Sequence, residues 1–146
     1  MADTGYNWGS WAFVQKGAAD WDNDALADDA CETSDAISLD GKAACIVSVQ
    51  AVEDGTGAIN GNCTIAILSD TEGTANNYED APGLAGAQVG SPFKFQFLPV
   101  QNDTVCLTFG VDPRFYDSFK IAVLNEGGQE LALDVRYKTA TVPVAS

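Results

Sequence analysis

The stretch FKIAVLNEGGQELALDVRY, at positions 119–137, decides how this chain folds. Its second limb, residues 131–137, alternates apolar with polar or small side chains, which is the period of two of a strand with one buried face. The first limb, residues 119–124, carries Phe119, Ile121 and Val123 on one face, although Ala122 and Leu124 make its other face only weakly polar. Gly127-Gly128 in the connector supplies the positive φ that a tight reversal needs. The stretch therefore predicts an antiparallel hairpin, which a second layer has to cover.

The same alternation recurs in short segments along the whole chain, and glycines and prolines separate them. The segments predicted to be strands are 8–15, 34–39, 43–52, 63–68, 93–97 and 104–111. The pair Asp40-Gly41 is a typical reversal signal, and no segment has the period of an amphipathic helix of three turns. Residues 1–146 are thus predicted to form a single all-β domain: an antiparallel β-sandwich of seven or eight strands, jelly-roll-like or Ig-like.

Several segments lack this period and are expected to lie outside the strands. They are an N-terminal arm at 1–10, an acidic loop at 20–35 with a short helical turn near 25–30, a loop at 53–62, a long loop at 69–91, and a C-terminal tail at 140–146. Loops as long as 69–91 are uncommon in compact domains, and they are usually functional or mobile.

The charge of the chain excludes some classes of partner. Its 21 acidic and 7 basic residues give a formal net charge of −14, which disfavours nucleic acids and anionic membranes because both need a basic surface. The first residues have neither the basic nor the apolar region of a secretory signal, and no apolar run reaches the ~20 residues of a membrane span. We therefore expect the chain to be made in the cytoplasm, or to have been cut before this numbering begins.

The residues that usually carry out catalysis are poorly represented. The chain has no histidine, so it lacks the commonest general base and the commonest transition-metal ligand. No phosphate-binding, dinucleotide-binding or zinc-protease motif is present. We expect neither an enzyme nor a cofactor-binding protein.

Acidic residues are concentrated between positions 20 and 35 and raise the question of calcium. The segment DWDND places oxygen ligands at Asp20, Asp22 and Asp24, as a calcium loop begins. The Gly and Glu that such a loop requires at its sixth and twelfth positions are replaced by Ala25 and Cys31. We expect a solvated loop without metal, with the three aspartates as the alternative calcium site.

Four cysteines are present without the spacing of a zinc site. Cys45, Cys63 and Cys106 lie within apolar strands, where cysteine behaves as a small buried hydrophobe. We expect reduced thiols in the cytoplasm, and the sequence leaves open whether Cys31 or any other cysteine forms a disulfide after release from the cell.

Aromatic residues cluster near the N-terminus, where they can form core, protein interface or sugar-stacking surface. Trp11 is predicted to lie in the core. The candidate interface residues are Tyr6, Trp8, Trp21 and Tyr78.

Several segments resemble small virion proteins of tailed bacteriophages. At the beginning these are WAFVQKGAA at 11–19 and SDAISLDGKA at 34–43; towards the end they are FGVDP at 109–113, FKIAVLN at 119–125 and LDVRY at 133–137. The resembled proteins are head decoration or cement proteins, which are β-rich, arrayed symmetrically on the capsid and without catalytic residues.

The resemblance implies a non-enzymatic virion protein that binds and stabilises the assembled head. Its expected partners are the lattice of the major capsid protein and further copies of itself, as a dimer or trimer, and its expected place is the outer capsid surface. Two alternatives remain open: a phage tail or fibre component, and a carbohydrate-binding β-sandwich module.

Overall fold

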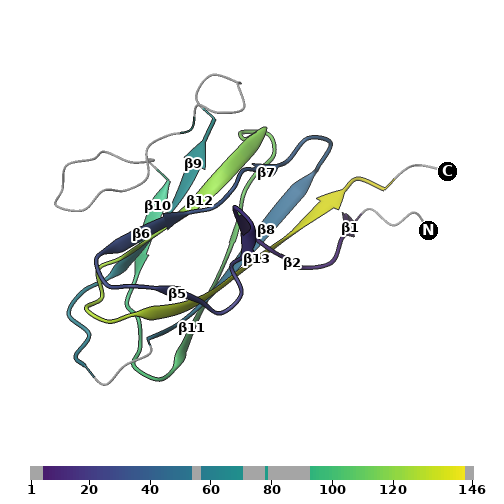
Figure 1. Cartoon of the computed structure of the whole chain (residues 1–146). Helices are drawn as coiled ribbons and strands as arrows, with labels where there is room; N and C mark the ends of the chain where they lie inside the picture. Colours follow the sequence, from purple (N-terminus) through teal and green to yellow (C-terminus); the bar gives the residue numbers. More distant parts are fainter. Residues whose placement is uncertain (1–4, 54–56, 71–77, 79–92, 144–146) are drawn as a thin grey trace.

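All regular structure in the described part of this protein is β-strand. The computed structural model describes residues 5–53, 57–70, 78 and 93–143, and these form thirteen antiparallel strands in three sheets (Figure 1). The predicted all-β fold is confirmed, although the strands are more numerous and several are only two residues long. In the described part of the chain, no helix is long and apolar enough to cross a membrane.

The larger sheet is built around two long central strands. Strand β13 pairs with β8 over ten residue pairs, from Leu131↔Glu53 to Ala140↔Ala44, and β11 pairs with the other side of β8. Three short strands follow one another along the free side of β13. The six strands are β1 (Asn7–Trp8), β2 (Ala12–Phe13), β5 (Asp24–Leu26), β8 (Ala44–Glu53), β11 (Thr104–Gly110) and β13 (Leu131–Thr141).

The smaller sheet is centred on β12, which pairs with β9 on one side and with β6 and β7 on the other. Its order is β10-β9-β12-β6, with β7 continuing the β6 edge. The five strands are β6 (Ala30–Thr33), β7 (Ile37–Ser38), β9 (Cys63–Ser69), β10 (Lys94–Phe97) and β12 (Ser118–Asn125). A small ribbon of β3 (Gln15–Lys16) and β4 (Ala19–Asp20) stands apart from both sheets.

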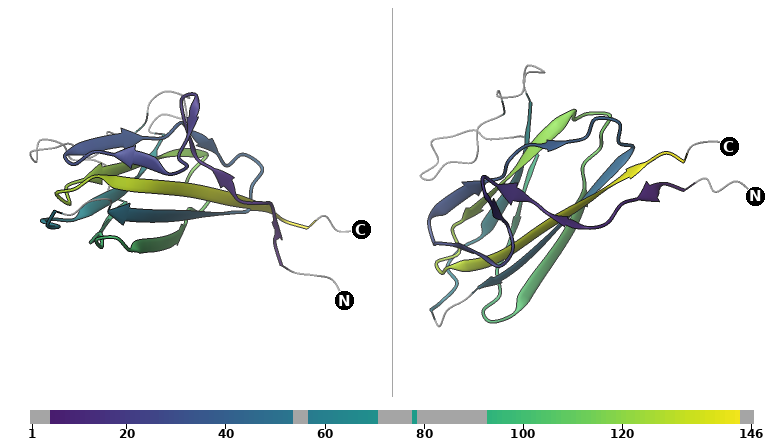
Figure 2. Two further views of the ribbon diagram at one scale, coloured as in Figure 1. Left: turned by 60° about the horizontal axis from the view of Figure 1, so that its bottom comes forward. Right: turned by 45° about the vertical axis from the view of Figure 1, so that its right-hand side comes forward.

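Both large sheets contribute to one hydrophobic core. The predicted apolar face of β8 is confirmed, because Cys45, Val47, Val49 and Ala51 are all buried there. The inward residues of β9, β12 and β13 join the same cluster: Ile65, Ile67, Phe119, Ile121, Val123, Leu131, Leu133 and Val135. The two sheets therefore form layers around a shared interior (Figure 2). The jelly-roll or Ig-like assignment stays a prediction.

The predicted hairpin at 119–137 is wrong. Its two limbs are β12 and β13, which lie in different sheets and do not pair with each other. The connector between them crosses from one layer to the other. β12 lies in the centre of its sheet because both of its faces are apolar: Ala122 and Leu124 are buried as well as Ile121 and Val123.

The crossing from β12 to β13 is stabilised by one buried polar side chain. Asn125, at the end of β12, donates from Nδ2 to the carbonyl oxygens of Leu26 at 3.1 Å and Gln129 at 2.7 Å. Its Oδ1 accepts from the backbone N–H of Gly127 at 3.0 Å. Gly128 has a φ of +97°, so the positive φ expected in this connector is confirmed, although it serves a crossing between sheets.

The predicted acidic loop at 20–35 is also wrong, and no helical turn lies near residues 25–30. The segment contains β5, which joins the six-stranded sheet, and β6, which joins the five-stranded sheet. It therefore connects the two layers at one end of the core. Trp21 and Leu26 are buried in that core. Their burial anchors a segment whose acidic side chains are exposed or partly exposed.

The predicted arms and loops agree with the structure only in part. Within the predicted N-terminal arm, Asn7 and Trp8 pair with Thr141 and Ala140 of β13, so this part of the arm and the start of the tail belong to the six-stranded sheet. Glu53, expected to begin a loop, is the last residue of β8 and is fully buried. Most of the predicted long loop, at 71–77 and 79–91, lies outside the described residues.

Candidate functional site

Exposed aromatic side chains form a strip over the outer surface of the six-stranded sheet. They come from β1, β2 and the residues beside them, which run antiparallel to the last part of β13, with Trp8 opposite Ala140 and Phe13 opposite Arg136. Tyr6, Trp8 and Trp11 remain 52%, 39% and 43% exposed. We call this the aromatic–cation strip; its members are Tyr6, Trp8, Trp11, Phe13, Arg136 and Lys138.

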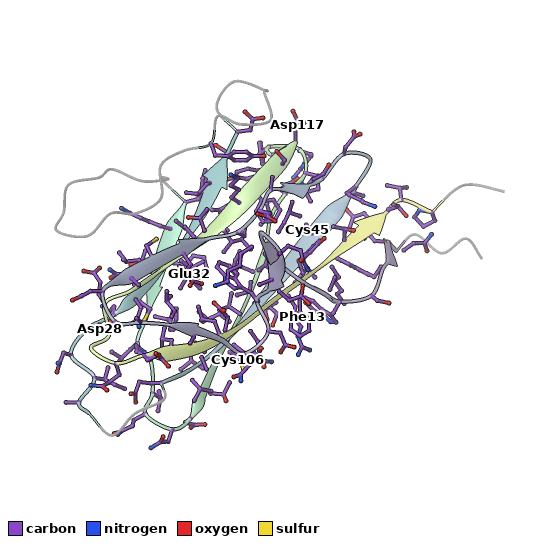
Figure 3. All side chains as sticks on the ribbon, viewed as in Figure 1. Phe13, Asp28, Glu32, Cys45, Cys106 and Asp117 are labelled. Atoms are coloured by element: carbon purple, nitrogen blue, oxygen red, sulfur yellow. The ribbon has the colours of Figure 1, made fainter. Side chains whose placement is uncertain are left out.

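Cations on β13 lie against three of the four aromatic rings of the strip. The Nζ atom of Lys138 lies 5.1 Å from the ring centroid of Trp8 and 4.9 Å from that of Trp11. The guanidinium carbon of Arg136 lies 4.5 Å from the ring centroid of Phe13, which is labelled in Figure 3. Each such contact contributes about 0.5–1 kcal/mol at an exposed site. These three rings are therefore fixed by their own chain while part of each faces solvent.

The strip differs in charge from the chain as a whole. Arg136 and Lys138 are two of only seven basic residues in a protein with a net charge of −14. Large aromatic side chains and arginine are also the residues enriched at the energetic centres of protein interfaces. Together these properties make the strip a surface suited to a protein partner with acidic or backbone oxygen groups.

The strip contains two of the four predicted interface residues, Tyr6 and Trp8. It also contains Trp11, so the prediction that Trp11 lies in the core is wrong. Strand alternation explains the error, because the inward residue of this segment is Val14, which is fully buried. Trp11 and Phe13 have the opposite parity and lie on the outer face.

Trp21 was predicted to be an interface residue, but its side chain is 0% exposed. Its backbone makes two hydrogen bonds. The N–H of Trp21 donates to the carbonyl of Val14 at 2.9 Å, and the carbonyl of Trp21 accepts from the N–H of Val135 at 3.0 Å. Its indole N–H donates to Oε2 of Glu32 at 3.1 Å. A side chain fixed in this way belongs to the core and is not available to a partner.

Tyr78 lies far from the strip, on the outer face of the five-stranded sheet. It packs against a small apolar cluster of Ala66, Leu68 and Ala122. Its hydroxyl oxygen is 2.5 Å from Oγ of Ser118, and Nζ of Lys120 lies 4.7 Å from its ring centroid. Tyr78 therefore covers its own sheet, and the structure does not bring it together with Tyr6 and Trp8.

The candidate calcium residues do not form a metal site. Within the described residues, no group of three or more Asp, Glu or Cys side chains is placed to hold a metal ion. The side chain of Lys16 takes the position between acids, with Nζ 2.6 Å from Oδ2 of Asp24 and 2.8 Å from Oε2 of Glu32 (Figure 3 labels Glu32). Asp20 instead bonds the side-chain amide of Gln15.

Lys16 joins β3 to both β5 and β6, and these last two strands lie in different sheets. Desolvation lowers the pKa of Lys16, but the hydrogen bonds to Asp24 and Glu32 together raise it by more, so the pKa lies above its ordinary value. The ammonium group is therefore stabilised in its charged form and neutralises part of the acidic segment.

Replacing Lys16 with methionine is expected to lower the free energy of unfolding by about 1–2 kcal/mol, because two half-buried carboxylates lose their cation. Urea denaturation at neutral pH measures the change. Lys42→Met, at an exposed position, is the matched control and should change stability by no more than about 0.5 kcal/mol. Equal stability of the two variants would show that the Lys16 pairs contribute nothing.

The cysteines fall into different environments. Cys45 and Cys63 are buried as predicted, and burial raises the pKa of each thiol to about 11. Cys106, which is labelled in Figure 3, was predicted to be buried but is exposed, because it lies on the outer face of β11. All four thiols are free in this structure.

Comparison with known proteins gives little further information. No known protein family and no curated protein matches the sequence. The chain is similar to a solved structure described as "Bacillus endospore appendages form a novel family of disulfide-linked pili", with 12% sequence identity and a TM-score of 0.43. The match covers 98% of this chain and 96% of that chain. A likeness at this level carries no argument about function.

Proposed function

We propose that this chain is a non-enzymatic structural protein that docks on an assembled protein shell through the aromatic–cation strip. In the form implied by its sequence, it is a decoration or cement protein on the outer surface of a tailed-phage head. The observation that carries the proposal is the exposure of Tyr6, Trp8 and Trp11 on a surface that their own chain has already made rigid.

Rigidity matters because association costs the entropy of every side chain that becomes ordered, about 0.5–1.5 kcal/mol each. In the strip, Lys138 already holds Trp8 and Trp11, and the backbone N–H of Gly9 donates to the carbonyl of Thr139 at 2.9 Å. Little additional ordering is required when a partner covers the rings. The strip is thus suited to repeated docking on identical lattice sites.

A second apolar surface allows contact with another neighbour. Phe93 and Phe115 are 62% and 76% exposed, and they belong to a groove beside β10 and β11 and not to the strip. A protein that stabilises a lattice has to contact more than one subunit. The aromatic–cation strip and the groove beside β10 and β11 are two separate surfaces of this kind on one domain.

The proposal is tested by adding the protein to shells from which it has been stripped. Wild-type protein should raise the temperature at which the shells rupture. The double variant Trp8→Ala/Trp11→Ala should bind at least tenfold more weakly, because truncation of a central aromatic contact costs about 2 kcal/mol or more. Leu98→Ala, at an exposed residue outside the strip, should behave as wild type. An unchanged rupture temperature with no wild-type binding would refute the proposal.

A carbohydrate-binding module would use the same exposed tryptophans to stack on sugar rings. However, Lys138 lies over the rings of both Trp8 and Trp11 and occupies one face of each. A glycan array separates the two functions: we expect no glycan-dependent binding, whereas binding that is lost in Trp8→Ala/Trp11→Ala would favour the sugar-binding function.

A further inference from the structure

The free edges of the two large sheets differ in their protection. A free edge offers unpaired backbone N–H and C=O groups to another strand, and natural proteins usually shorten, break or charge such edges. One edge of the six-stranded sheet is divided among the short strands β1, β2 and β5. In the five-stranded sheet, β10 has four residues and includes Lys94, and β6 has four residues and includes Glu32.

β11 has none of these protections. It is seven residues long, reads TVCLTFG from Thr104 to Gly110, and contains no charged residue and no proline. In the part of the chain that the structure describes, it pairs with β8 alone. The left view of Figure 2 shows β11, in green, as the lowest strand at the left of the molecule, beyond β8. In a chain with 21 acidic residues, a long uncharged edge is conspicuous.

An apolar groove accompanies this edge. It has a volume of about 500 Å³ and lies where β10 and β11 leave the core incompletely covered. The rings of Phe95 and Phe109 meet edge to face at its base, with centroids 5.0 Å apart. The core-side residues Val105, Leu107 and Phe109 are only half-buried for the same reason. An added strand would complete the cover over these side chains.

We propose that a second copy of this chain adds its own β11 to this edge, antiparallel and about a two-fold axis at Leu107. In this register Val105 lies opposite Phe109 of the second copy, and Leu107 lies opposite its equivalent, all on the core side. On the outer side Cys106 lies opposite Thr108. The two six-stranded sheets then form one continuous sheet of twelve strands, since each contributes six.

The sequence of β11 favours a second copy as the occupant because it is complementary to itself. Reversing TVCLTFG about Leu107 places apolar residues opposite apolar residues on the core side and small residues opposite small residues on the outer side, and well-matched cross-strand pairs stabilise sheets. Antiparallel pairing about a two-fold axis also closes, so that it gives a dimer and not a fibre. Two chains of charge −14 approach each other most easily along an edge that carries no charge.

The contact is small. Seven residues span about 24 Å, which with a sheet about 10 Å thick covers roughly 240 Å² per copy. A standard stable interface buries about 800 Å² per partner. The isolated protein should therefore dimerise only weakly, and pairing should become extensive where copies are held side by side. This pairing does not depend on the aromatic–cation strip.

Disulfide trapping tests both the contact and its register. Thr108→Cys places a thiol opposite Cys106 of the second copy, so mild oxidation of the folded protein with oxidised glutathione should give a covalent dimer. Cys106→Ser/Thr108→Cys lacks the opposing thiol and should give at least tenfold less dimer. Thr141→Cys, at an exposed position on the central strand β13, should likewise give little dimer. Equal yields from all three variants would overturn the proposed register and contact.

Sedimentation of the full chain without oxidant gives an independent measurement. The average mass of the wild-type protein should rise towards that of a dimer as its concentration approaches about 1 mM. Thr108→Asp puts a negative charge on the pairing edge and should raise the dissociation constant at least tenfold, whereas Thr141→Asp should not. A wild-type mass that stays monomeric, or one that responds equally to both aspartates, overturns the proposal whether or not the protein binds shells.

Discussion

Replacing Asn125 with alanine is expected to lower the free energy of unfolding by about 3–5 kcal/mol. The substitution removes two hydrogen bonds to backbone carbonyls and one from the backbone N–H of Gly127. Each bond contributes about 1 kcal/mol, and a buried polar group left without a partner costs a further 1–3 kcal/mol. Because these bonds fix the passage from β12 to β13, their loss weakens the connection between the two sheets.

Asn62→Ala is the matched control, since it makes the same change at an exposed position. Asn62 directly precedes Cys63, the residue that pairs with Asn125. It should alter stability by no more than about 0.5 kcal/mol. Chemical denaturation followed by tryptophan fluorescence measures both variants. If Asn125→Ala were as stable as Asn62→Ala, the crossing between the sheets would be held by its backbone alone.

Raising the pH from 9 to 11 is expected to reduce stability by about 4 kcal/mol through the thiols of Cys45 and Cys63. Burial raises the pKa of both thiols from 9.0 to about 11; for Cys63, hydrogen bonds from the backbone of Glu126 and Gly127 oppose the shift. The unfolded chain therefore releases these protons at lower pH than the folded chain. Stability is fully present below pH 9 and declines as the pH rises through 11, by about 2 kcal/mol per thiol.

Cys45→Ala should remove about half of this pH dependence while lowering stability at pH 8, because it leaves a small cavity. Cys106→Ala should leave the pH dependence unchanged, since the Cys106 thiol is exposed. Denaturation measured in the presence of a reductant from pH 8 to pH 11 gives the slope of the unfolding free energy against pH for each variant. A slope that is the same in wild type and Cys45→Ala would contradict the role of the buried thiol.

The positions of the strands could largely be predicted from the sequence. The alternation of apolar and polar side chains located β8, β9, β10 and β11 to within about two residues, because that period follows directly from strand geometry. The alternation does not, however, specify which strands pair. β12 and β13 are consecutive and have the period of a hairpin, yet they belong to different sheets. The apolar residues on both faces of β12 were the available signal for a central strand.

The candidate site could be predicted only in part, because burial in this region depends on the exact phase of each strand. Val14, and not Trp11, faces the core, and a shift of one residue in the phase exchanges the two faces. The charge of the 20–35 segment concealed the strands β5 and β6, because the buried apolar residues of this segment, Trp21 and Leu26, are too far apart to show a period of two. Lys138, which fixes both exposed tryptophans, comes from the far end of the sequence, and only the pairing of β1 and β13 reveals it.

The most direct measurement is the protein composition and electron microscopy of particles released by the cells that make this chain. We expect the chain to be present in a fixed ratio to the major shell protein and to form repeated density on the outer surface of the shell. We expect Trp8→Ala/Trp11→Ala to be depleted from the same particles. Complete particles that lack the wild-type chain would contradict its assignment as a shell-binding structural protein.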